Sequence, residues 1–145
     1  MGSGLRLIFF IYFLILMVII LYYVQSVYIA RNVISDALSS AIDSAIIYGT
    51  IASDVGRGEV RLDRDKVKQG ITAMLKANLR LDDSLSSETF RRGKLAVQVT
   101  HNSDGVPRVE AEFSAEIDIG IMRLFGQDEY TIRVPRKTPY LTEYK

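Results

Sequence analysis

The sequence predicts an α+β fold, in which one long N-terminal α-helix packs on a small antiparallel β-sheet. Three observations predict it: an apolar run near the start, helical spacing that continues beyond that run without proline, and a change of hydrophobic period from 3.6 to 2 near Leu95. Charge divides the chain similarly, because residues 1–55 hold five charged side chains while the remainder holds 16 basic and 14 acidic residues. The 145 residues therefore provide a weakly charged, apolar N-terminal segment and one modest domain.

The apolar run extends from Leu7 to Val24 and contains 18 residues without a charge. A helix needs about 20 mostly apolar residues to cross a bilayer core, so this run can span a membrane. A cleaved secretory signal is disfavoured, because its apolar region is typically about 7–15 residues long and Tyr-Tyr-Val-Gln-Ser is a poor cleavage site. A plain membrane anchor and a filament-core helix remain. We expect the N-terminus inside and the head outside, since Arg6 precedes the run and large domains cross largely regardless of charge.

The helix is expected to continue past the membrane. No proline occurs between Gln25 and Ser53, which predicts one helix from about Leu5 to about Ser53, ended by Gly56 and Gly58. A row of mostly small apolar residues recurs at steps of three and four and would form one helix face. This row consists of Ala30, Ile34, Ala37, Ala41, Ala45, Tyr48 and Ala52.

The apolar surface of this second half covers roughly two thirds of the helix circumference, which predicts burial on more than one side. Small side chains let helix backbones approach closely, so we favour packing against other subunits. The alternative is a core helix within one chain, with alanine present for its helix propensity. The predicted organisation is a transmembrane or filament-core helix over residues 1–26, its continuation packed on the head over 27–53, and a small α+β head over 54–145.

The head is predicted to open with a loop from Gly56 to Leu62 and a short amphipathic helix from Arg64 to Leu79. Asp63 is the expected N-cap of that helix, because its carboxylate can accept from free backbone N–H groups. The polar stretch Leu81–Arg92 is expected to be a loop.

Strict alternation then predicts an antiparallel sheet. Its first strand is expected from Leu95, and a hairpin turn at Asn102–Gly105 leads into the return strand. The inward residues of the return strand are expected to be Val109, Ala111, Phe113, Ala115, Ile117 and Ile119. A short apolar segment at Ile121–Phe125, closed by Gly126, then precedes a strand Tyr130–Val134 that ends at Pro135. So small a domain buries little, and the long helix is its expected cover.

Few residues suggest chemistry. The absence of cysteine excludes thiolate metal sites and disulfides, and one histidine, His101, cannot form a multi-histidine site within one chain. His101 is therefore expected to be a hairpin-tip residue. The dinucleotide-binding, P-loop, zinc-protease and serine-hydrolase motifs are all missing, so we predict no enzyme, no metal and no cofactor.

Three groups of charged residues are candidate binding sites. Glu110, Glu112, Glu116 and Asp118 form an acidic row on one strand face. Their spacing spreads the carboxylates along a line rather than around a Ca²⁺ ion, so pairing with neighbouring bases such as Arg133 is favoured. The same reasoning applies to the Asp82–Asp83 pair. A cluster of Arg91, Arg92 and Lys94 could contact phosphate, but ordinary surface charge is favoured, and a net charge of +1 predicts no nucleic-acid partner.

The order of parts resembles the type IV pilin-like superfamily, and most closely its TadE-like pseudopilins. The resemblance rests on the apolar run Leu7–Val24, its continuation through Ala30–Ala52, and the Leu124-Phe125-Gly126 turn leading into the strand Tyr130–Val134. It implies a subunit whose N-terminal helices bundle into a filament core, after extraction from the membrane by an assembly ATPase and platform proteins. A leader cut after a glycine, as in type IV pilins, would fall at Gly4 and place Phe9 fifth.

We therefore expect a structural subunit of an extracellular pilus-like filament on the cell surface, a helical homo-oligomer with a single-pass membrane pool before assembly. The alternative is a single-pass, membrane-anchored accessory or binding module of a secretion or conjugation apparatus. The expected assembly interface lies on the helix and comprises Leu7, Phe10, Phe13, Leu14, Met17, Ile20, Leu21, Ala30, Ala37, Ala41 and Ala45.

Overall fold

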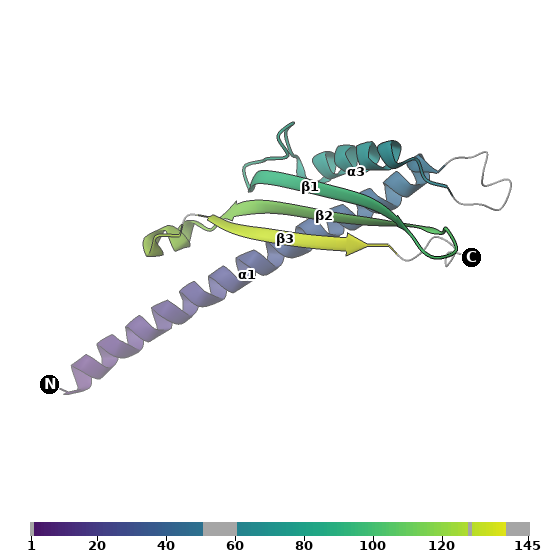
Figure 1. Ribbon diagram of the computed structural model, residues 1–145. Coiled ribbons are helices and arrows are strands. Elements are labelled where there is room, and N and C mark those ends of the chain that lie inside the picture. The colour runs from purple at the N-terminus through teal and green to yellow at the C-terminus, as the bar shows by residue number, and fades with distance from the viewer. Residues whose placement is uncertain (1, 51–60, 128, 139–145) are drawn as a thin grey trace.

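The computed structural model describes residues 2–50, 61–127 and 129–138. A three-stranded antiparallel sheet in the order β1-β2-β3 packs on two helices (Figure 1), which confirms the predicted α+β class. The N-terminal half of α1 projects beyond the sheet, and α3 lies beside the C-terminal end of α1. The elements are α1 (Gly2–Gly49), α3 (Arg64–Leu79), β1 (Phe90–His101), β2 (Pro107–Asp118), the 3₁₀-helix η1 (Gly120–Phe125) and β3 (Glu129–Lys137).

Helix α1 is a single helix of 48 residues, about 70 Å long at ~1.5 Å per residue. It ends at Gly49, earlier than the predicted end near Ser53. Thr50 already forms a bridge with Leu62, and the Asp63 N–H donates to the Gly49 carbonyl at 3.0 Å. Residue 49 also lies against α3, because a Cβ there would come within 2.4 Å of Val67 Cγ2. The expected helix residues 51–53, the predicted terminators Gly56 and Gly58, and most of the predicted loop lie outside the described residues.

Helix α3 matches its prediction at both ends. The Asp63 side chain caps it by accepting from the N–H groups of Asp65 and Lys66, at 3.1 and 3.2 Å. Arg80 ends it in the left-handed conformation. Val67, Ile71 and Leu75 are fully buried, so the helix turns its apolar face inward.

The central strand β2 confirms the predicted alternation, since all six residues expected inward are buried. The turn before it is also as predicted, because the Asn102 side chain accepts from the N–H groups of Asp104 and Val106 at 2.9 and 2.8 Å. Gly105 supplies the positive φ of 78° that this turn requires. Helices α1 and α3 cover the apolar face of the sheet, with Phe113 fully buried at its centre.

Two strand boundaries correct the sequence prediction. Strand β1 begins at Phe90 rather than Leu95, and a β-bulge between Arg91 and Lys94 accommodates the extra residues. Gly93 is required in this bulge, because a Cβ there would lie 1.9 Å from the Leu85 carbonyl oxygen. Strand β3 runs through Pro135 to Lys137 instead of ending there, which an edge strand tolerates because one of its sides needs no ladder hydrogen bonds.

Candidate functional site

The feature that most needs a functional explanation is the exposed apolar surface of the projecting half of α1. The apolar window in this half has no residue buried within the monomer, and the helix is long and apolar enough to cross a membrane. Phe9 and Tyr12 remain 68% and 69% exposed. Seven of the predicted interface residues lie here and are all exposed: Leu7, Phe10, Phe13, Leu14, Met17, Ile20 and Leu21. We call the segment Leu7–Val24 the apolar rod.

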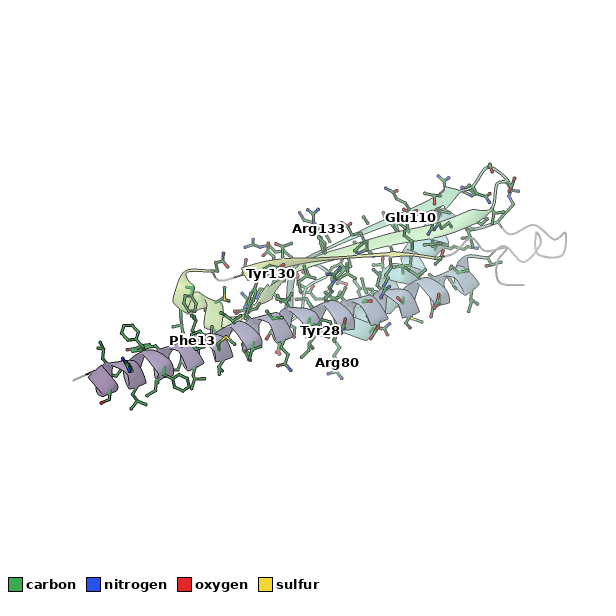
Figure 2. The ribbon with its side chains drawn as sticks, turned by 90° about the horizontal axis from the view of Figure 1, so that it is seen from below. Phe13, Tyr28, Arg80, Glu110, Tyr130 and Arg133 are labelled. Atoms are coloured by element: carbon green, nitrogen blue, oxygen red, sulfur yellow. The ribbon has the colours of Figure 1, made fainter. Side chains whose placement is uncertain are left out.

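The apolar rod has the dimensions of a membrane span. Its 18 residues extend about 27 Å as a helix, close to the ~30 Å of a bilayer hydrocarbon core. Tyrosines mark its end, as aromatic residues do at membrane interfaces. Tyr22 is exposed, and Tyr23 packs edge-on against Tyr130 of β3 with ring centroids 5.9 Å apart. Tyr28, one turn further along, points away from the sheet (Figure 2). The head therefore begins where the apolar rod ends.

The other four predicted interface residues lie elsewhere. Ala30, Ala37, Ala41 and Ala45 are buried in the monomer's own core. The close approach inferred from these alanines is made to α3 of the same chain, because a Cβ on Gly70 would come within 3.1 Å of the Ala45 Cβ. Asn78 of α3 also donates to the Ala37 carbonyl at 3.5 Å. The broad apolar face is divided between α3 and the sheet, so these alanines present little surface to a neighbouring subunit.

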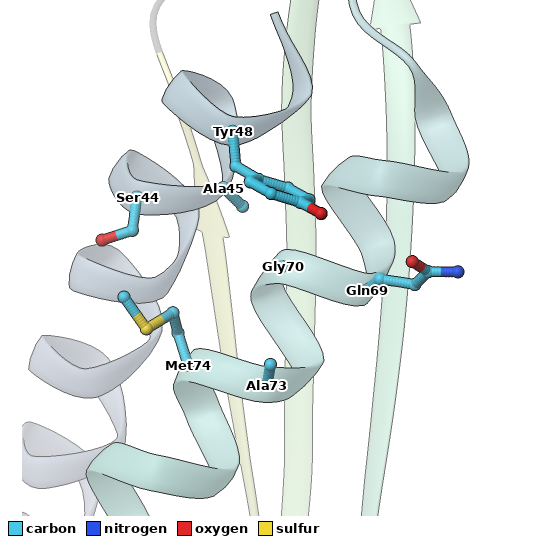
Figure 3. Close-up of a pocket in the computed structure, with 7 residues that line it drawn as sticks. All are labelled: Ser44, Ala45, Tyr48, Gln69, Gly70, Ala73 and Met74. Carbon is cyan, nitrogen blue, oxygen red and sulfur yellow. The ribbon is translucent and has the colours of Figure 1, made fainter.

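Sequence reasoning missed a shallow apolar groove between the ends of α1 and α3. Figure 3 shows Ala45 and Tyr48 of α1 directed towards Gly70 of α3, with Met74 closing the groove from the α3 side. The groove has a volume of about 380 Å³ and no charged residue among those that line it. Tyr48, Met74 and the neighbouring Ile47 are 66%, 42% and 80% exposed, and we call these three the distal patch. Ala45 and Tyr48 belong to the predicted alanine row, but the row does not show that Tyr48 stays exposed at the end of the contact with α3.

The acidic row on β2 lies on the face of the sheet away from the helices, and its members Glu110, Glu116 and Asp118 are paired with bases of the same domain. Lys137 lies 3.3 Å from Glu110, and Arg92 lies 3.2 Å from Glu116. Asp118 pairs with Arg123 and lies 3.9 Å from Arg91. The expected partner Arg133 is instead opposite Ser114 in the sheet register. These pairs also engage two members of the basic cluster, which is consistent with ordinary surface charge.

The remaining candidate residues serve local structure. The Asp82 carboxylate accepts from the Ser84 hydroxyl and from the N–H groups of Ser84 and Ser86, and these hydrogen bonds hold the pKa of Asp82 below its usual value of 3.8. Asp83 pairs with Lys76 at 2.8 Å. His101 is exposed beside the hairpin turn. Within the described ranges, no three His, Asp or Glu side chains gather where they could hold a metal ion.

Comparisons with protein-family models, with curated proteins and with solved structures found no match for this chain.

Proposed function

We propose that this protein is a structural subunit of an extracellular pilus-like filament, held in the membrane by its apolar rod before assembly. The observation that carries the proposal is the exposure of the apolar rod on every side. Fully burying one large aliphatic or aromatic side chain is worth about 1.5–3 kcal/mol, so this surface requires a non-aqueous environment. Lipid supplies it in the membrane, and neighbouring copies of the apolar rod supply it in a filament.

Exposed apolar residues outside the apolar rod support the filament over a simple anchor. A helix that served only as an anchor would need no apolar surface beyond the bilayer. Ile29 and Val33 nevertheless leave apolar surface exposed just above the apolar rod, and the distal patch does so at the far end of α1. Both patches are on α1 or against it, so the bundling of neighbouring α1 helices would bury them together with the apolar rod.

One observation favours the second candidate, a membrane-anchored binding module of a secretion or conjugation apparatus. Between the two patches, the outward row of α1 carries Asp36, Ser40 and Asp43, which are exposed and suit solvent. A polar middle section is unusual in a tightly packed helical bundle. In this alternative, the head would remain in water and bind its partner there.

Electron microscopy of the full chain after detergent removal tests the two candidates. The filament proposal predicts thin helical fibres, and it is wrong if the chain yields only proteoliposomes or monodisperse particles. The informative variant is Ile47→Glu, because Ile47 is 80% exposed and the substitution leaves the monomer core intact. It should prevent fibres while preserving membrane insertion. Ser103→Glu, at an exposed residue in the hairpin turn, adds the same charge away from α1 and should leave fibres unchanged.

A further inference from the structure

The short helix η1 lies at the end of the head that faces the apolar rod. It follows β2 directly and contacts α1. Tyr23 of α1 lines a small hollow together with Met122 of η1, with Ile119, which directly precedes η1, and with Tyr130 of β3. Figures 1 and 2 agree that η1 extends past the end of the sheet towards which the N-terminal half of α1 projects. The base of η1 therefore lies at the level of Tyr23, where the apolar rod ends.

The tip of η1 is apolar and has no cover within the described residues. Leu124 and Phe125 are 78% and 57% exposed, whereas Ile121 and Met122 pack against the core and fix the helix in place. Gly126 closes the turn with a positive φ of 75° and donates its N–H to the Arg123 carbonyl at 3.1 Å. The two exposed side chains are thus presented by a hydrogen-bonded turn that is anchored at its base.

Charged residues border this apolar tip on the side of the head. Arg123 pairs with Asp118, and Arg91 lies 3.7 Å from Glu129. An apolar tip below a charged rim is the arrangement of a protein segment that sits in a membrane interface. The rim can remain in the headgroup region while only the tip enters the acyl chains.

We propose that η1 is a second membrane contact, in which Leu124 and Phe125 insert into the lipid interface beside the transmembrane part of α1. A phospholipid bilayer is the occupant that the position of η1 favours, because η1 lies at the end of the apolar rod, which is long and apolar enough to cross that bilayer. Because the head is packed on α1, two points of attachment fix the rotation of the whole molecule about the α1 axis relative to the bilayer. The charged face of the sheet is then held in a constant orientation to the membrane. The inference rests on the membrane stage of the proposed function.

Tryptophan fluorescence in lipid vesicles tests the proposal, because the chain contains no tryptophan. Phe125→Trp in the full chain is reconstituted into phosphatidylcholine–phosphatidylglycerol vesicles that contain lipids brominated near the headgroup or deep in the acyl chains. We expect blue-shifted emission and stronger quenching by the shallow bromines. Phe13→Trp is the reference within the span, and His101→Trp, at the far end of β1, is the aqueous control that should not be quenched.

The outcomes separate the possible errors. If Phe13→Trp is quenched and Phe125→Trp is not, the interfacial contact is wrong while the span stands. If neither is quenched, the membrane stage itself is wrong. A blue shift at Phe125→Trp that appears only when protein is crowded in the vesicles, without quenching by bromines, assigns the tip to a neighbouring subunit and overturns the lipid proposal. Leu124→Asp added to Phe125→Trp should abolish the quenching without changing the circular dichroism melting curve, and quenching that persists would contradict insertion.

Discussion

The two halves of α1 belong to one uninterrupted helix but have different surroundings. Over the apolar rod, every side of the helix is apolar and the monomer covers almost none of it. From Ala30 to Gly49, the row that faces the head is buried and the opposite row carries Asp36, Ser40 and Asp43. The first half is built for surroundings that other molecules provide, whereas the inward row of the second half is built for its own domain. Substitutions should therefore affect insertion in the first half and folding in the inward row of the second.

The largest expected effect comes from a charge in the apolar rod. Ile15→Lys places an ammonium group near the middle of the span, where it costs about 2.5–3.5 kcal/mol of insertion free energy. The head does not contact this exposed residue and should fold normally. Fractionation with alkaline extraction would show the variant shifting from the membrane pellet to the supernatant. Ser40→Lys is a matched change in the outward row of the second half, and this variant should remain in the membrane pellet. Its appearance in the supernatant would contradict the different roles of the two halves of α1.

A smaller effect is expected from overpacking the second half. Ala41 is fully buried, so Ala41→Leu forces extra methylene groups into the contact of α1 with the head and should destabilise the fold by about 1–3 kcal/mol. For a domain of this size that lowers the melting temperature by about 4–8 °C per kcal/mol. Circular dichroism in detergent would record the shift. The neighbouring exposed Ser40→Leu should melt within about 0.5 kcal/mol of the wild type.

Removal of the α3 cap tests the head alone. Asp63→Ala leaves the N–H groups of Asp65 and Lys66 without their acceptor and should destabilise the fold by about 1 kcal/mol. Asp63→Asn retains an acceptor oxygen and should recover most of this loss. Insertion of the apolar rod should be identical in all three proteins, and a change in membrane extraction would mean that the two halves are coupled.

The smallest effect is a pH dependence from the exposed loop that follows α3. The pKa of Asp82 is lowered in the folded protein, chiefly by the Ser84 hydroxyl and then by the Ser86 N–H. Its contribution to stability is therefore complete above pH 3.8 and is lost as the pH falls through the lower pKa of the folded state. Thermal melts of wild type and Asp82→Asn across this acidic range should converge at the lowest pH. A difference in melting temperature between wild type and Asp82→Asn that does not change with pH would contradict a contribution from the lowered pKa of Asp82.

Local signals in the sequence were sufficient for much of the head. The cap at Asp63, the hairpin at Asn102 and the inward row of β2 each depend on residues close in sequence, and the structure confirms all three. The errors arose where the deciding contact was distant. Phe90 joins β1 because it pairs with Ile117 of β2 beyond the bulge, and β3 continues through Pro135 because it is an edge strand.

For the candidate site too, the sequence predicted what depends on neighbouring residues and missed what depends on distant contacts. The length and composition of the apolar rod predict an exposed apolar helix without any knowledge of the fold. The alanine row correctly indicated a close helix contact, but a periodic pattern does not identify the partner, which is α3 of the same chain. The exposure of Leu124 and Phe125 depends on how η1 is placed against α1, which no local pattern encodes.

Cysteine scanning along α1 tests the central claim most directly, because the chain contains no cysteine of its own. Single cysteines are placed through both halves of the helix in the chain dispersed in lipid vesicles, and a membrane-impermeant maleimide is applied. We expect uniform protection over the apolar rod, then periodic labelling, with Val33, Asp36, Ser40, Asp43 and Ile47 reactive and Ile34, Ala37, Ala41 and Ala45 protected. Periodic labelling that began within the apolar rod, or uniform protection of both halves, would contradict this claim.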